Sequence, residues 1–285
     1  MKILICGISG FIGRKLEKEF IKQQWIVNSI KKSDFILGDL EFSKKIEGND
    51  VIINLCGAPI LKRWTKKYKE IIYNSRILTT NKIVNALKLM KEKPSVFITT
   101  SAVGIYEEDY INSESDCKYA NGFLATVCKD WEKAAMPANE IIRTVIFRLG
   151  VVLGKDGGAF PKMNKPFKYG IGGKLGNGKQ AFPWIYIDDL VQAYFFAIKN
   201  KDISGECNLV APQIVCNSEF TKELSKYYKF PALLFVPAFI LKLIYGSASE
   251  TFLKGQKVIP ESLKNLKFDF KYINLEIAFV ELFKR

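Results

Sequence analysis

The chain has 285 residues, of which 48% are hydrophobic and 25% charged, as is typical of a folded globular protein rather than a disordered or fibrous one. Lys and Arg exceed Asp and Glu to give a formal charge of +14, but the cations are spread along the whole chain, which favours anionic small molecules over nucleic acids as partners. Histidine is absent and the six cysteines form no C-x-x-C pair, which excludes histidine-dependent triads and leaves no metal site to expect.

The first thirteen residues predict a nucleotide-binding turn. A strand pattern over Lys2–Cys6 leads directly into a turn with glycines at positions 7, 10 and 13, and a helical pattern follows from Arg14. Glycines let a pyrophosphate approach the unpaired N–H groups at the positive end of the helix. The alternative is an ordinary strand-to-helix turn. The predicted cofactor contacts here are Gly7, Ser9, Gly10, Phe11, Ile12 and Gly13.

The end of the second predicted strand, Trp25–Ile30, bears on cofactor preference. In dinucleotide-binding folds an acidic residue there binds the ribose of NAD, whereas basic residues accommodate the 2′-phosphate of NADP. Lys31 and Lys32 occupy this position, so we expect NADP(H) in preference to NAD(H). The alternative is that both are surface lysines without a role. Asp39 and Leu40, after a further short strand, are predicted to contact the adenine.

The third predicted strand, Val51–Leu55, ends in a second segment suited to the cofactor. Cys56 and Gly57 follow it, and a glycine there lets the backbone pass close to a pyrophosphate. Leu55, Cys56 and Gly57 are therefore predicted cofactor contacts.

The remaining pattern predicts an α/β fold of Rossmann type. Strands alternate with helices, which is typical of a doubly wound parallel sheet with helices on both faces and ligands at the carboxyl ends of the strands. Between residues 150 and 182 the chain is glycine-rich and is expected to form loops over the cleft. The further elements are strands over Val96–Thr100, Thr144–Leu149 and near Cys207–Val210, and helices over Lys66–Met90 and Gly122–Ala135.

We expect two parts, a dinucleotide-binding domain over residues 1–230 and a small, mostly helical substrate-side region over 231–285. The apolar run Pro231–Leu241 is interpreted as core or as a subunit contact, the latter in a homodimer. No apolar run approaches the length of a membrane span and no cleavage site follows the first strand, so we expect a cytoplasmic protein without a membrane partner.

Motifs along nearly the whole chain resemble an extended short-chain dehydrogenase/reductase. Within that superfamily the sequence is similar to the atypical branch of NAD(P)-dependent epimerase/dehydratase family proteins, some of which carry the older label of cell-division inhibitors. The resemblance implies a dinucleotide cofactor and a substrate that is anionic or sugar-like. It rests on residues 7–13, 54–60, 63–65, 75–80, 100–106, 131–132, 148–153, 156–158, 184–189, 208–212, 236–239 and 255–256.

The usual catalytic dyad of the superfamily is missing. Members typically use a Tyr-x-x-x-Lys pair, but aligning Glu132 with the usual glutamate of that helix places Leu124 and Cys128 at the two positions. The candidates to replace the dyad are Ser101, Tyr106 and Cys128. The Ser101 hydroxyl suits a substrate oxygen or, alternatively, caps the strand. The Cys128 thiol has a lowered pKa beside a lysine or, alternatively, is a buried small hydrophobe.

Four further residues are candidate ligand contacts. Arg148, at a strand end, is predicted either to bind the cofactor or to form an ion pair with Asp188 or Asp189. The predicted substrate contacts are Arg63, Trp64 and Trp184.

Two functions remain open from the sequence. The first is an NADP(H)-binding oxidoreductase of nucleotide-sugar-epimerase type with an unknown substrate. The second is a catalytically silent NADP(H)-binding protein with a regulatory or scaffold role, which the missing dyad favours. A nucleic-acid-binding role based on net charge ranks third.

Overall fold

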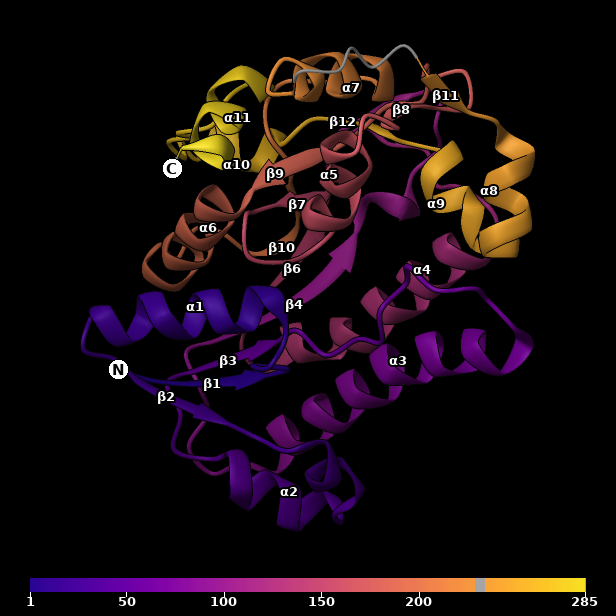
Figure 1. Cartoon of the computed structure of the whole chain (residues 1–285). Coiled ribbons are helices and arrows are strands. Elements are labelled where there is room, and N and C mark those ends of the chain that lie inside the picture. The colour runs from indigo at the N-terminus through magenta and orange to yellow at the C-terminus, as the bar shows by residue number, and fades with distance from the viewer. Residues whose placement is uncertain (229–233, 285) are drawn as a thin grey trace.

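The structure, a computed structural model, describes residues 1–228 and 234–284, and its centre is a parallel β-sheet (Figure 1). The sheet strands are β1 (Lys2–Cys6), β2 (Ile26–Ser29), β3 (Val51–Asn54), β4 (Val96–Ala102), β6 (Arg143–Leu149) and β10 (Gly205–Leu209). Within the described residues these six pair in the order β10-β6-β4-β3-β1-β2. In the sheet, β2 pairs with one edge of β1 and β3 pairs with the other edge, so the strand order reverses at β1. The carboxyl ends of β1 and β3 therefore frame the crevice in which doubly wound folds bind ligands.

Helices cover both faces of this sheet, as Figure 1 shows. Alternate strand residues point to opposite faces: Ile3 and Ile5 pack with α1 and α6, whereas Leu4 and Cys6 pack with α2 and α3. Burial on both faces is what the nearly continuous apolar strand sequences require. The helices that follow or flank the sheet strands are α1 (Phe11–Lys22), α2 (Asp39–Ile46), α3 (Lys66–Leu89), α4 (Phe123–Ala135), α5 (Phe160–Lys168), α6 (Ile187–Lys199) and α7 (Asn217–Ser225).

The doubly wound fold predicted from the sequence is confirmed, but two segments differ from the prediction. The further short strand expected between β2 and Asp39 is not found in this described segment. Residues 32–36 instead form a short 3₁₀ helix, η1 (Lys32–Ile36), whose first turn is closed by Lys31 N–H donating to Asp34 Oδ2 at 2.7 Å. The glycine-rich region from 150 to 182 holds β7 (Val151–Leu153), α5 and β8 (Gly173–Leu175) instead of loops alone. Two prolines in α5 obscured its helical pattern.

The carboxyl-terminal residues are joined to the sheet domain by strand pairs and a buried carboxylate. β11 pairs with β8, and β12 pairs with β5. Asp189, at the start of α6, accepts hydrogen bonds from the backbone N–H groups of Lys271 (3.0 Å) and Tyr272 (2.9 Å).

The predicted domain boundary at 230/231 lies outside the described residues. The remaining elements are β5 (Ile111–Asn112), β9 (Trp184–Tyr186), β11 (Leu234–Val236), β12 (Lys257–Val258), α8 (Ala238–Tyr245), α9 (Glu250–Leu253), α10 (Glu261–Asn265), α11 (Leu275–Phe283), η2 (Val103–Ile105), η3 (Met136–Glu140) and η4 (Gly246–Ser249).

The apolar run at 231–241 is described from residue 234 onward. Leu234, Phe235 and Phe239 are 51%, 62% and 69% exposed, whereas Leu241 is buried, so only the end of this part forms core as one interpretation expected. A contact with a second copy of the chain stays a prediction. Among the described residues, no helix has the length and apolar character needed to cross a membrane.

Candidate functional site

A cavity of about 880 Å³ lies at the carboxyl ends of β1, β3 and β4. The turns that follow these strands form its inner wall, and residues between 149 and 183 together with α8 and α9 form its outer wall. The predicted contacts that line it are Gly7, Gly10, Phe11, Ile12, Gly13, Leu55, Cys56, Gly57, Ser101 and Cys128.

The turn between β1 and α1 leaves the start of the helix open to an anion. Gly7 has a φ of +88°, and a Cβ there would lie 3.0 Å from the carbonyl of Leu55. At Gly13 a Cβ would lie 2.6 Å from the carbonyl oxygen of Ile8, so only glycine allows this close packing. Gly10 is the N-cap of α1, and no side chain of the described residues caps the helix. Its first N–H groups are therefore available to a ligand.

The Phe11 side chain is held in place by a second glycine cluster. A Cβ at Gly154 would lie 2.6 Å from the Phe11 ring, and Gly157 and Gly158 also face this ring. These glycines make room for an aromatic side chain at the first position of α1. Their sequence motif was recognised, but its partner lies too far away along the chain to be predicted.

Side chains of β3 and α3 fix the turn after β3. Asn54 Oδ1 accepts a hydrogen bond from the Cys56 N–H at 3.1 Å. Ser75 Oγ accepts one from the Ala58 N–H at 2.9 Å, and Arg76 Nη2 donates to the Ala58 carbonyl oxygen at 3.1 Å. The backbone of this turn is thus held from both sides against the cavity.

Arg76 places a positive charge in the cavity wall, which sequence analysis did not predict. Its guanidinium packs against Gly57, where a Cβ would lie 3.0 Å from Cζ, and lies 5.2 Å from the Trp131 ring centre. No carboxylate of the described residues lies within ion-pair distance of it, and burial lowers its pKa. Arginine nevertheless stays charged, so its free N–H groups favour an oxyanion of a ligand. Gly57 therefore makes room for this guanidinium as well as for a cofactor.

Ser101 lines the cavity, and its hydroxyl is buried and unsatisfied. The residue is 3% exposed, and its Oγ has no hydrogen-bond partner of acceptable geometry within residues 1–228 and 234–284. It lies near the Cys128 thiol, a weak acceptor. A buried hydroxyl without a partner is costly, so Ser101 is the residue of the cavity lining whose polar group most needs a partner.

Cys128 is a buried thiol, in agreement with the second of its two interpretations, and its pKa is raised and not lowered. Burial raises its pKa to about 12, and Glu132 adds to this increase, while the opposing effect of Arg76 is smaller. Cys56 behaves in the same way, with a pKa raised by burial to about 12. Neither residue is a thiolate nucleophile at neutral pH.

Arg148 and Tyr106 belong to a buried network outside the cavity. Arg148 is 2% exposed and pairs with both carboxylate oxygens of Glu132, through Nε at 2.8 Å and Nη2 at 2.7 Å, and not with Asp188 or Asp189. Its Nη1 donates to the Tyr106 hydroxyl at 2.7 Å, which donates to Asn208 Oδ1 at 2.8 Å. These bonds connect β6, α4 and β10 through the segment after η2, and neither Arg148 nor Tyr106 lines the cavity.

The three predicted substrate contacts also lie outside the cavity lining. Trp184 is fully buried in the main core because β9 carries it beneath the outer wall. Trp64 is 7% exposed and donates its indole N–H to the Ile60 carbonyl oxygen at 2.9 Å. Arg63 is exposed and lies beside Gly246. Trp184 and Trp64 pack in two separate hydrophobic clusters, and the indole N–H of Trp184 has no partner among the described residues.

The residues predicted to contact the 2′-phosphate and the adenine of the cofactor lie on the surface, in the segment that follows β2. Lys31 and Lys32 are exposed, and the nearby carboxylate of Asp34 is occupied by Lys45 at 2.9 Å, which lowers the Asp34 pKa. Asp39 pairs with Lys82 at 2.6 Å. Two further predicted contacts, Ser9 and Leu40, are exposed and lie outside the cavity lining.

The fold and the glycine turn define a dinucleotide-binding protein of Rossmann type. The sequence model of the NAD dependent epimerase/dehydratase family matches residues 3–209, and a domain of unknown function, DUF1731, matches residues 236–282. The chain therefore belongs to the NAD dependent epimerase/dehydratase family.

Relatives match along nearly the whole chain. An epimerase family protein of Staphylococcus aureus is 36% identical over 295 residues, which cover 99% of this chain and 98% of the relative. A protein of Arabidopsis thaliana named as a chloroplastic homologue of the epimerase family protein SDR39U1 is 35% identical, over 95% of this chain and 84% of its own length.

Two solved structures share the arrangement. Human epimerase family protein SDR39U1, crystallised with NADPH, superposes with a TM-score of 0.92 at 28% identity and covers 99% of both chains. A nucleoside-diphosphate sugar epimerase of Corynebacterium glutamicum gives a TM-score of 0.79 at 30% identity, covering 98% of this chain and 57% of that one.

Proposed function

We propose that the protein binds NADP(H) in this cavity and acts as an oxidoreductase on a substrate whose polar oxygen faces Ser101. The observation that carries the proposal is the buried Ser101 hydroxyl, which lacks a partner among the described residues and lines the same cavity as the open N-terminus of α1. The NADPH bound to the human relative supports the choice of cofactor.

Each part of the cofactor has a matching group in this chain. The free N–H groups at Gly10–Gly13 suit a diphosphate, and the Arg76 guanidinium supplies a nearby positive charge. Lys31 and Lys32 suit a 2′-phosphate because the neighbouring Asp34 is already paired. The cofactor would supply hydride chemistry, and Ser101 would hold the substrate oxygen.

Calorimetric titration with NADPH and, separately, NADH tests the cofactor assignment. We expect NADPH to bind more tightly than NADH. Binding of neither dinucleotide would contradict the proposal.

Replacing Lys31 by Asp and Lys32 by Ser should shift the cofactor preference. We expect the ratio of NADPH to NADH affinity to fall about tenfold, equivalent to about 1.4 kcal/mol, because two cations near the 2′-phosphate are lost. Lys44→Ser replaces an exposed lysine on α2, outside the predicted phosphate contacts. This variant is the control and should leave the affinity ratio unchanged. An unchanged ratio in the double variant would make Lys31 and Lys32 ordinary surface residues.

Ser101→Ala should separate substrate chemistry from cofactor binding. We expect the rate of NADPH consumption with an active substrate to fall about 100-fold, as when one oxyanion donor is removed, while NADPH affinity is retained. The measurement is the decay of NADPH absorbance, with Ser33→Ala as an exposed control. If Ser101→Ala turns over substrate at the normal rate, the hydroxyl has no role in the reaction.

The second candidate function is a catalytically silent NADP(H)-binding protein. The observation that favours it is the pair Leu124 and Cys128, which lines the cavity without any acid, base or fixed charge at neutral pH. This function predicts tight NADPH binding with no NADPH consumption in a broad screen of carbonyl compounds.

A further inference from the structure

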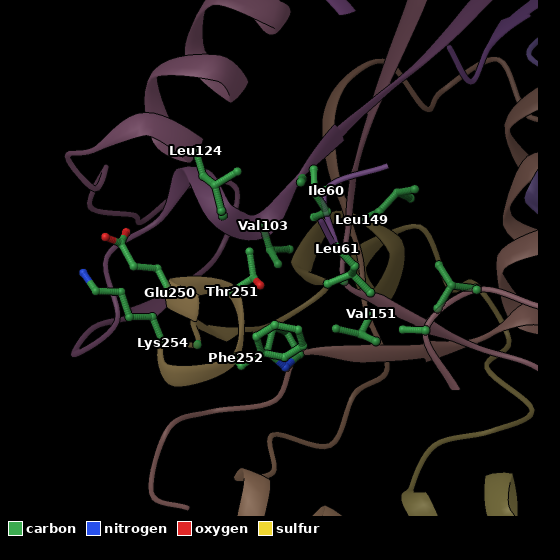
Figure 2. A pocket seen from close by; sticks show the side chains of 18 of the residues that line it. Ile60, Leu61, Val103, Leu124, Leu149, Val151, Glu250, Thr251, Phe252 and Lys254 are labelled. Carbon is green, nitrogen blue, oxygen red and sulfur yellow. The ribbon is translucent and has the colours of Figure 1, made fainter. Parts of the chain in front are cut away.

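The outer part of the cavity is apolar. We call this part the outer chamber and define it by the side chains of Ile60, Leu61, Val103, Leu124, Leu149, Val151 and Phe252. Figure 2 shows these side chains around a common space, with the charged ends of Glu250 and Lys254 to one side. The chamber thus has an aliphatic and aromatic lining and a charged rim.

Three polar side chains of the cavity lining make hydrogen bonds within the protein. Gln180 Nε2 donates to the carbonyl oxygens of Leu175 (3.0 Å) and Phe252 (2.8 Å). Asn217 Oδ1 accepts from the Leu175 N–H at 2.9 Å. The Thr251 hydroxyl donates to a backbone carbonyl at 2.7 Å. These bonds hold the chamber walls together and occupy the N–H groups of the Gln180 amide, the amide oxygen of Asn217 and the Thr251 hydroxyl.

The three cations that line the cavity are poorly placed for a diphosphate in the chamber. Lys162 follows Gly158 by four residues, and Gly158 faces the Phe11 ring on the cofactor side. Lys254 is paired with Glu108 at 3.2 Å across the rim. The Arg76 guanidinium lies against Gly57. The backbone nitrogen of the preceding residue, Cys56, lies 3.2 Å from a Cβ built on Gly7, so this segment lies beside the glycine turn. Arg76 therefore belongs to the cofactor side of the cavity. A second diphosphate in the apolar chamber would lose its hydration without gaining an ion pair, which is strongly unfavourable.

Leu124 makes this wall apolar at the position where the family's tyrosine is expected. Its side chain faces Val103 in Figure 2 and lies within 3.9 Å of a Cβ built on Gly104. The change from tyrosine removes a hydroxyl and adds aliphatic surface. Ser101, which lines the same cavity, then remains as a buried hydroxyl without a partner among the described residues.

We propose that the outer chamber binds an apolar or aromatic molecule with one carbonyl or hydroxyl oxygen directed at Ser101, and not a sugar nucleotide. This inference rests on the proposed function because it assumes NADP(H) in the inner part of the cavity. It differs from the anionic or sugar-like substrate that the family resemblance implies.

The test uses the full chain saturated with NADPH, after NADPH binding itself has been measured. Acetylnaphthalene, an aromatic ketone, and UDP-glucose are then titrated separately by calorimetry. We expect acetylnaphthalene to bind at least about tenfold more tightly than UDP-glucose, because only the ketone avoids burying an unpaired charge. Tighter binding of UDP-glucose, or binding of neither compound, would overturn the inference.

Two variants test whether the ketone binds in the outer chamber. Leu124→Asp should weaken acetylnaphthalene binding at least about tenfold, and an aspartate in the first turn of α4 is compatible with the helix dipole. Ile21→Asp, at a 56% exposed position on α1, is the matched control and should change nothing. Retained NADPH binding shows that each variant is folded. Unchanged ketone affinity in Leu124→Asp would refute the site, whereas failure of the normal protein to bind NADPH would reject the proposed function itself.

Discussion

Glu132→Gln should destabilise the protein by about 3 kcal/mol, because it leaves the Arg148 guanidinium buried without a countercharge. Both side chains are almost fully buried, and the carboxylate accepts two hydrogen bonds from this one arginine. Removing one partner of such a pair costs far more than removing one partner at the surface. The measurement is the free energy of unfolding from urea denaturation.

Glu281→Gln is the matched control for this prediction. Glu281 lies 3.8 Å from Lys284 in an exposed pair on the last helix, so we expect a change below about 1 kcal/mol. A double variant, Glu132→Leu with Arg148→Met, should recover much of the lost stability because no charge remains buried. Equal effects of Glu132→Gln and Glu281→Gln would mean that the buried pair does not stabilise the fold.

The same network shows where prediction from the sequence failed. Arg148 was correctly interpreted as a side chain that needs an anion, but Asp188 and Asp189 were considered and Glu132 was not. Asp189 instead binds the backbone N–H groups of Lys271 and Tyr272. Glu132 of α4 reaches Arg148, and Asp189 of α6 reaches residues 271 and 272, only when these two helices pack on opposite faces of the sheet. No local sequence pattern encodes that packing.

Local features were predicted more successfully. The strands of the central sheet were predicted to within two residues. The signal is clearest for β1, β3 and β4, because both of their faces are buried and their sequences are largely apolar. The glycine turn after β1 was found because its contacts lie within one strand–turn–helix unit. Arg76 was missed because its role depends on Gly57 and Trp131, which belong to other elements.

Gly10→Val should abolish detectable NADPH binding while leaving the fold intact. The residue is exposed, has a φ of −71° that valine can adopt, and a Cβ there would lie 3.3 Å from the Gly7 carbonyl oxygen. We therefore expect a stability change below about 1 kcal/mol. The branched side chain would block the approach to the first N–H groups of α1. Loss of two charge-assisted hydrogen bonds lowers affinity by about 100-fold or more.

Gly38→Val provides the control for this loss of affinity. Gly38 is also an exposed N-cap glycine, at the start of α2, and no atom lies within 4 Å of a Cβ built there. Calorimetric titration should give normal NADPH affinity for Gly38→Val and none for Gly10→Val, with both variants unfolding at similar urea concentrations. If Gly10→Val binds NADPH normally, the diphosphate does not lie at the N-terminus of α1. The cofactor would then have to be bound mainly through Arg76 and the turn after β3, and the free N–H groups of α1 would need another partner.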